Sequence, residues 1–152
     1  MKKHIVAVCV LSLLLSISAF AWKDKKSDPD GPYPRRDEAK NLWGYVNEAG
    51  KFIIKPQFTH GSDFYEGLAA IKMGDKWGFI DRSGKIVIKP QFQDEWIFYE
   101  DLAKVEFNDR WGYINKNGDY AIAPVYHAVE SFQEGLAAVM YDKKWGFIDK
   151  TG

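Results

Sequence analysis

Three glutamates recur at a fixed spacing and are the first candidates for carboxylate chemistry in this chain. Glu66, Glu100 and Glu134 are equally spaced along the sequence. Hydrolysis of a glycosidic bond needs two carboxyl groups in unlike environments, one of which holds a proton. Equivalent positions in a repeat have like environments, so the spacing favours glutamates that bond a backbone or cap a turn. A glycan-acting enzyme is therefore the least favoured interpretation.

Two further sets of residues can be weighed as metal ligands. One amide or acid recurs at the same spacing as the glutamates, at Asn47, Asp81, Asn115 and Asp149. Calcium takes about six to eight oxygen ligands, so these sparse residues are predicted to lie in turns. His60 and His127 have no carboxylate or thiol motif beside them, which disfavours a metal pair or an acid/base role. Catalytic motifs of the common hydrolase and nucleotide-binding types are absent too, and we predict no catalytic residue, metal or cofactor.

Tryptophan-glycine pairs form the most regular feature of the sequence, in which aromatic residues reach 16 %. Like the three glutamates, the pairs recur every 34 residues without any insertion, at Trp43-Gly44, Trp77-Gly78, Trp111-Gly112 and Trp145-Gly146. The four indoles could form a ladder that binds sugars or quaternary amines. Their large apolar area favours a role as the core of each unit instead. A residue that recurs in phase is explained by the fold and is weak evidence for a binding site.

Residues that break the repeat are better candidates for contacts with a partner. They gather in the connector that varies between units, and connectors of repeat arrays usually carry specificity. The later units have Asp and Ala at the position of His60, and the other units have Ser and Glu at the position of Trp96. The alternative for Trp96 is that it fills a local gap. The predicted contact residues are His60, Glu95, Trp96 and Tyr99.

Each interval between successive tryptophans predicts a three-stranded antiparallel meander and a longer connector. In the second unit the strands are residues 68–73, 76–81 and 85–89. Gly74-Asp75 and the turn from Asp81 to Gly84 join them, because these residue types accept positive φ or bond their own backbone. Pro90 is predicted to end the third strand, since it cannot donate to a sheet ladder. The glycine after each tryptophan indicates a close approach, which we assign to an indole of a neighbouring unit.

One meander cannot bury its apolar face alone, so neighbouring units must cover one another. We therefore predict an all-β fold in which tandem 34-residue repeats of three-stranded antiparallel meanders stack as an open array, with ten strands in total. A propeller-like closure is the rival architecture. Propellers usually have at least four blades, each with four strands and about 40 residues, which fits this sequence poorly.

The full repeat is longer than the Trp-Gly pair. It reads Trp-Gly-aromatic-Ile-Asp-x-x-Gly-Lys-x-x-Ile-x-Pro-x-Phe, followed by Phe-x-Glu-Gly-Leu-Ala. This pattern resembles the bacterial WG-repeat family, also called the KWG-repeat family, and Lys76, Arg110 and Lys144 supply the basic residue before the tryptophan. The resemblance covers about residues 41–152. It implies a β-rich repeat array, often in exported proteins, without a catalytic residue or a cofactor.

The two ends of the chain differ from the repeat. Residues 1–21 have the basic start, apolar run and small-x-small site of a signal peptide, with an uncleaved membrane anchor as the alternative. Residues 22–40 are rich in Lys, Asp, Pro and Arg and predict a polar leader or linker. The repeat domain, 41–152, holds three and a half units and stops inside a turn. We favour a truncated reading frame, and the alternative is an exposed edge strand that pairs with another chain.

The composition limits which binding partners and which cellular compartment are expected. Without Lys2 and Lys3, 19 basic residues face 21 acidic ones with no basic cluster, which disfavours nucleic acid and anionic membranes. No cysteine remains after residue 21, so thiol chemistry is excluded. We predict an exported (periplasmic, envelope-associated or secreted), non-catalytic binding module for protein or envelope glycan, with no membrane span after cleavage. A purely structural spacer or stalk is the alternative.

Overall fold

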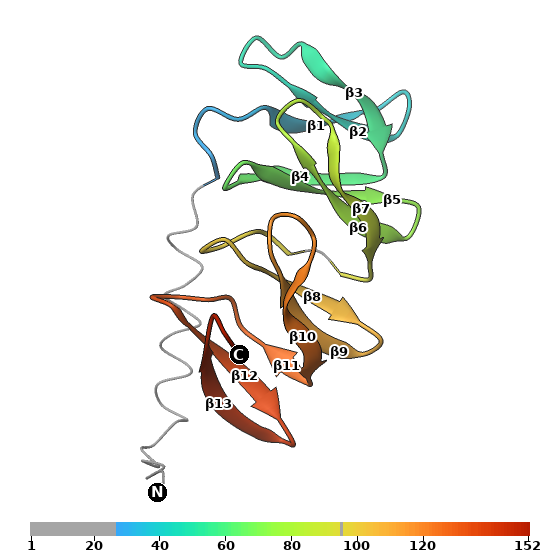
Figure 1. The fold of residues 1–152 in the computed structure, drawn as a ribbon. Helices are drawn as coiled ribbons and strands as arrows, with labels where there is room; N and C mark the ends of the chain where they lie inside the picture. The colour runs from blue at the N-terminus through green and yellow to red at the C-terminus, as the bar shows by residue number, and fades with distance from the viewer. Residues whose placement is uncertain (1–26, 95) are drawn as a thin grey trace, which may run out of the picture.

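Four small antiparallel sheets stack one on another along the molecule (Figure 1). The computed structural model describes residues 27–94 and 96–152, so the predicted signal peptide at 1–21 and the candidate contact residue Glu95 lie outside the described residues. The first and the last sheet lie at opposite ends of the stack. The predicted all-β open array of tandem repeats is therefore confirmed. Across the described ranges, no helix is long and apolar enough to cross a bilayer.

Neighbouring strands of each sheet also follow one another in the chain. The first sheet contains β1 (Tyr33–Asp37), β2 (Leu42–Val46) and β3 (Phe52–Phe58). The second contains β4 (His60–Tyr65), β5 (Leu68–Met73), β6 (Lys76–Asp81) and β7 (Ile86–Phe92). The third contains β8 (Ala103–Phe107), β9 (Arg110–Ile114) and β10 (Tyr120–Tyr126), and the fourth contains β11 (Ala128–Val129), β12 (Leu136–Tyr141) and β13 (Lys144–Asp149).

The backbone φ values and side-chain hydrogen bonds of the turn residues agree with the prediction from their residue types. Asn108 and Asp109 both have positive φ in the loop between β8 and β9, as a two-residue hairpin loop requires. In the turn after β6, the carboxylate of Asp81 accepts hydrogen bonds from the backbone N–H groups of Ser83 and Lys85. Gly84 closes this turn with a φ of 86°. Hairpin geometry is thus set by residues within each turn.

The third strand of a unit does not end at its proline, so that prediction was wrong. β7 runs to Phe92 and includes Pro90. Its pairing with β6 shifts register between the Trp77–Phe92 pair and the Phe79–Ile88 pair, which brackets Pro90 in a bulge. A residue in a bulge need not donate to the ladder, and this is why the strand tolerates proline.

Part of the predicted connector is strand as well. β4 pairs with β5, and the short β11 pairs with β12. A tyrosine of the preceding sheet holds each of these segments: the Tyr45 hydroxyl donates to the carbonyl of Ser62 at 3.0 Å, and the Tyr113 hydroxyl donates to that of Glu130 at 2.6 Å. Phe79 occupies the equivalent position in the second unit and has no hydroxyl. The described residues of 93–97 form no strand there.

The described part of the predicted leader is also ordered into a strand. β1 pairs with β2 over five residue pairs, from Tyr33 opposite Val46 to Asp37 opposite Leu42. The polar leader or linker predicted for residues 22–40 therefore contributes a strand to the first sheet. Backbone pairing holds β1, and most of its side chains remain exposed. The sequence therefore has no apolar periodicity there for a pattern search to find.

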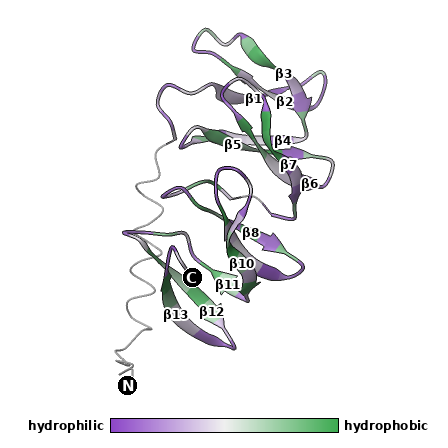
Figure 2. Cartoon of the chain, viewed as in Figure 1, coloured by the Kyte–Doolittle hydropathy of each residue, from purple (hydrophilic) through white to green (hydrophobic). Residues whose placement is uncertain are grey.

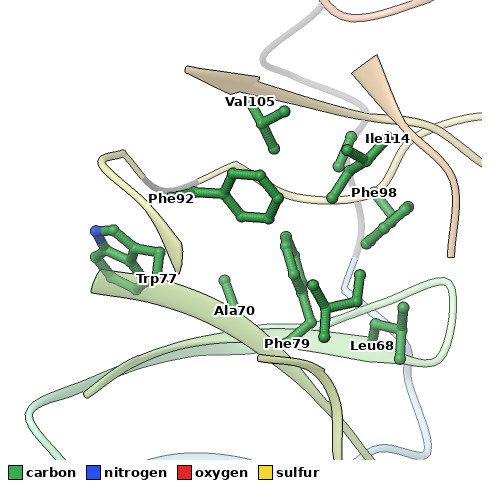
Figure 3. Packing of buried hydrophobic residues seen from close by; sticks show 10 residues of the cluster. Leu68, Ala70, Trp77, Phe79, Phe92, Phe98, Val105 and Ile114 are labelled. Atoms are coloured by element: carbon green, nitrogen blue, oxygen red, sulfur yellow. The ribbon is translucent and has the colours of Figure 1, made fainter. Parts of the chain in front are cut away.

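The hydrophobic core is divided into three clusters, each lying between two successive sheets. In β5, Ala69 and Ile71 belong to the cluster shared with the first sheet, and Leu68 and Ala70 to the cluster shared with the third. Figure 3 shows this second cluster, in which Trp77, Phe79 and Ala70 face Phe98, Val105 and Ile114. The inner sheets are buried on both faces, which explains the continuous apolar runs in their strands. Figure 2 shows the polar residues gathered at turns.

In the first three Trp-Gly pairs, the absence of a side chain on the glycine leaves room for the backbone of a neighbouring strand. Our prediction that an indole of a neighbouring unit fills this space was wrong. A Cβ on Gly78 would lie 2.5 Å from the carbonyl oxygen of Ile88 and 2.6 Å from the nitrogen of Pro90. Gly44 and Gly112 have the same surroundings in their own units. The bulge beside the proline brings the third strand this close. Gly146 has nothing within 4 Å of the corresponding position.

Candidate functional site

The recurring glutamates join one unit to the next. The carboxylate of Glu66 accepts the backbone N–H of Glu100 at 2.7 Å and that of Asp101 at 3.0 Å. Glu100 in turn accepts the N–H of Gly135 at 3.0 Å. Each carboxylate thus binds a turn whose residues have positive φ. The prediction that these glutamates cap turns is confirmed for Glu66 and Glu100.

Asp28 begins this carboxylate ladder, which we define as Asp28, Glu66 and Glu100. Asp28 accepts the backbone N–H of Glu66 at 3.0 Å and that of Gly67 at 2.8 Å. Sequence reasoning missed this residue because it lies four positions before the one that the repeat spacing predicts, where the chain has Pro32. A single acid in a polar segment carries no periodic signal.

Basic residues that recur at the repeat spacing flank the ladder. Arg82 pairs with Asp28 at 2.9 Å, Lys116 with Glu66 at 3.2 Å and Lys150 with Glu100 at 3.3 Å. Burial alone would raise the pKa of Asp28, but hydrogen bonds from Arg82 and the backbone of Gly67 hold it below its usual value. The ladder is therefore a line of hydrogen-bonded ion pairs with a role in assembly of the stack.

His60, a predicted contact residue, lies between two in-phase tryptophans. Its ring centroid is 5.0 Å from that of Trp43 and 5.4 Å from that of Trp77. Trp43 belongs to the first sheet and Trp77 to the second, so His60 bridges two units. His60 is exposed, Trp43 is half-buried and Trp77 is buried. The exposed imidazole thus packs against the half-buried ring of Trp43 and the buried ring of Trp77.

Trp96 lies against a different in-phase tryptophan. Its ring meets Trp111 edge to face at a centroid distance of 5.7 Å, and the ammonium of Lys104 lies 3.6 Å from the Trp96 ring centroid. Lys104 also donates to the carbonyl of Val129 at 3.1 Å and lies 3.7 Å from the Glu130 carboxylate. A cation this close to an indole face and shielded from water is held strongly. These contacts fix the orientation of Trp96.

Lys104 is a site residue that sequence reasoning missed. It is 7 % exposed, and the equivalent residues of the other units are Ala70 and Ala138. A lysine is almost never fully buried without partners, so it marks a place where the second connector departs from the common packing. Comparison of the units position by position would have found it, because a charge replaces a methyl group within an apolar strand.

The predicted contact residues do not all come together. His60 and Trp96 make their ring contacts with different indoles. Tyr99 lies in the turn that the Glu66 carboxylate caps, where its N–H donates to the carbonyl of Leu102. The indole nitrogen of Trp96 is buried and has no hydrogen-bond partner within the part of the chain that the structure describes. Most buried donors in folded proteins have a hydrogen-bond partner.

The in-phase tryptophans are not all core residues. Trp77 is buried, Trp43 and Trp111 are half-buried against their clusters, and Trp145 is 40 % exposed. The expectation that every indole forms the core of a unit was therefore wrong for Trp145, over which no further sheet of the described chain lies. Tyr45, Tyr113, Phe58, Phe64, Phe98 and Phe132 are the most deeply buried large side chains.

The amide and acid residues that were weighed as calcium ligands lie in turns, as predicted. Asn47, Asp81 and Asn115 each accept a backbone N–H four residues ahead, and Asp149 accepts that of Thr151. Within residues 27–94 and 96–152, no group of three or more His, Cys, Asp or Glu side chains is placed to hold a metal ion.

Comparison with known proteins agrees with the repeat geometry. No curated protein matches the chain. The family model described as "WG containing repeat" matches three consecutive segments, residues 43–77, 77–111 and 111–145. These segments run from one tryptophan to the next and together cover more than half of the chain. The chain therefore belongs to the WG-repeat family.

Proposed function

We propose that this protein is an exported, non-catalytic binding module that contacts a protein or an envelope glycan through its connectors. One observation carries the proposal: an aromatic residue that breaks the repeat is held against in-phase tryptophans in two successive units. His60 lies between Trp43 and Trp77, and Trp96 lies on Trp111 under the ammonium of Lys104.

Rings fixed in this way suit recognition. A tryptophan or histidine that is already oriented loses little conformational entropy when a partner binds. Flat aromatic faces pack against the apolar face of a sugar ring or against apolar side chains, and their polar edges donate hydrogen bonds. The connectors thus present rigid, partly polar aromatic surfaces.

Two matched histidines allow a direct test. His60 and His127 are both exposed connector residues, but the ring contacts of His60 join it to two indoles. Retention of envelope material on the immobilised protein is expected to fall at least about tenfold for His60→Ala and for Trp96→Ala, as for other interface anchors. His127→Ala is the control and should retain as much as the natural chain.

The outcome separates the candidate roles. Treatment of the extract with protease or with glycan-degrading enzymes before the experiment identifies which class of partner is retained. Equal retention by the natural chain, His60→Ala and Trp96→Ala would contradict the proposal and support the spacer or stalk. The carboxylate ladder is the observation that favours this second candidate, since it ties the units into one stack.

Export is tested separately. The expected mature chain begins at Trp22, and the mass of the protein recovered outside the cytoplasm would check this. Recovery of the full chain from the membrane fraction would instead support the uncleaved anchor.

A further inference from the structure

In the first two sheets, a positively charged residue lies directly opposite the in-phase tryptophan. Arg36 of β1 is opposite Trp43, and Lys72 of β5 is opposite Trp77. Directly opposite residues of an antiparallel pair lie on the same face of the sheet, with Cβ atoms about 4.5–5.5 Å apart. The Lys72 ammonium lies 5.7 Å from the centroid of the Trp77 ring. Each of these two indoles therefore has a cationic side chain as its neighbour.

His60 lies between these two pairs and connects them. Its ring packs against those of Trp43 and Trp77, and the residue directly opposite it in β5 is again Lys72. His60 and Arg36 are exposed, and Trp43 and Lys72 are half-buried. We define Arg36, Trp43, His60 and Lys72 as the cationic face. It spans the junction of the first and second sheets and has aromatic and cationic side chains as neighbours.

The protein supplies little negative charge to the cationic face. Among the described residues, no carboxylate forms an ion pair with Lys72. Arg36 lies 3.9 Å from the exposed carboxylate of Glu38 and donates a hydrogen bond to the side-chain oxygen of Asn41. An exposed ion pair of this kind contributes little free energy, so the carboxylate of a ligand can replace Glu38 at low cost.

The equivalent positions of the next unit carry the opposite charge. Glu106 lies opposite Trp111, and Asp94 occupies the position of His60. The cation of that unit, Lys104, is buried and donates to a backbone carbonyl. The tryptophan recurs in every unit and the accessible positive charge beside it does not. The charge is therefore not a requirement of the fold, and by the same reasoning as for His60 it indicates specificity for a ligand.

We infer that the cationic face binds a glycan whose sugar units carry carboxylate groups. This inference rests on the binding function proposed above and names the ligand class for the surface around His60. A uronic acid unit has an apolar ring face and a carboxylate at its edge, so one unit matches an aromatic ring with a cation beside it. The planar guanidinium of Arg36 suits a carboxylate, and the ammonium of Lys72 supplies a second charge. An acidic peptide has carboxylates without a flat apolar face next to them.

Polygalacturonate is the probe, and its methyl ester is the matched control, because esterification removes the charge and keeps the sugar ring. Titration calorimetry with the natural chain, in a buffer without calcium, is expected to show saturable binding of polygalacturonate. The methyl ester is expected to bind at least about tenfold more weakly, because it cannot form charge-assisted hydrogen bonds. Added salt should weaken the binding of polygalacturonate, since salt screens charges at an exposed surface.

Lys72→Met is the decisive variant of the chain, because it removes the ammonium and keeps an unbranched apolar side chain beside Trp77. It is expected to weaken the binding of polygalacturonate at least about tenfold, with the melting temperature unchanged. Arg36→Gln should weaken binding in the same direction. Lys89→Met is the matched control, since Lys89 is an exposed lysine of β7 outside the cationic face, and it should leave the affinity unchanged.

Three results would overturn this inference. The first is no saturable binding of polygalacturonate by the folded natural chain. If that chain still retains envelope material and His60→Ala does not, the binding function proposed above stands and only the ligand class is wrong. The second is equal affinity for polygalacturonate and its methyl ester, or for the natural chain and Lys72→Met. The third is equally tight binding of polyglutamate, because an acidic protein segment would then be the partner.

Discussion

The carboxylate of Glu66 crosses the junction between two units and accepts the backbone N–H of Glu100 at 2.7 Å. Its other oxygen accepts the N–H of Asp101 and lies 3.2 Å from the ammonium of Lys116. Burial would lower the pKa of Lys116, but its hydrogen bonds with Asp101 and Glu66 raise it above the usual value. Stability of the stack therefore depends on charged groups at the junctions as well as on the core.

Glu66→Gln is expected to lower the free energy of unfolding by about 1–2 kcal/mol, because it removes the charge and one of two oxygen acceptors from a capped turn. Chemical denaturation would measure this. Glu134→Gln is the matched control, since no hydrogen bond or ion pair joins the Glu134 side chain to the described residues. Equal loss at both positions would mean that the junction contacts do not stabilise the stack.

Gly78→Ala is expected to destabilise the protein by roughly 2–3 kcal/mol or to prevent folding, because the new Cβ would overlap the backbone of β7. The same substitution at Gly146 should be neutral or slightly stabilising, since that position faces open space. Thermal melting of the two variants gives the comparison. A neutral Gly78→Ala would contradict the close approach of the strands.

Trp77→Ala and Trp145→Ala should differ in cost although both residues belong to the same repeat position. The buried indole of Trp77 contributes to the cluster in Figure 3, and its removal is expected to cost about 3–5 kcal/mol. Trp145 is 40 % exposed, so its removal should cost less than about 2 kcal/mol. Denaturant titration of each variant would show whether the indoles contribute by burial or by repeat position.

Asp28→Asn should change how stability depends on acid. The folded-state pKa of Asp28 lies below its ordinary value of 3.8, so the unfolded chain takes up this proton first as the pH falls. The stability that the carboxylate contributes is complete above that value and is lost as the pH falls through the folded-state pKa. The variant should therefore be less stable near pH 7, with the difference shrinking below about pH 4. A constant difference across the acid range would argue against the Arg82 pairing.

Tyr113→Phe should act in the alkaline range. Burial and the nearby Glu130 carboxylate raise the pKa of Tyr113 well above its ordinary value of 10.0. The unfolded chain loses this proton first, so the contribution is present below pH 10.0 and falls as the pH rises beyond it. The free energy of unfolding of the variant should be lower by about 1 kcal/mol at neutral pH, because the hydrogen bond to Glu130 is lost. As the pH rises above 10.0, the variant should lose less stability than the natural chain. Tyr141→Phe, at an exposed tyrosine, is the control in a pH series of melts.

Most local features of this fold could be predicted from the sequence. Turn residues such as Asp81 and Gly84 act within a few positions of themselves, so their types reveal the hairpins. The repeat of Trp-Gly and Ile-x-Pro places the strands, and the periodic glutamates indicate capped turns. The candidate site was predicted in part, because His60 and Trp96 stand out from their equivalents when the units are compared.

The tertiary structure decided what joins the units. Asp28 takes the place in the ladder that a glutamate at position 32 would have in a regular repeat. β1 forms by backbone pairing, without an apolar pattern in its sequence. The close approach of Gly78 to β7 depends on a bulge, and the burial of Lys104 depends on the second connector, which places Trp96 over its ammonium. Each of these contacts joins strands or units through geometry that only the assembled stack defines. The sequence determined the unit because its signals are local, and the junctions between units were decided by how the sheets pack in three dimensions.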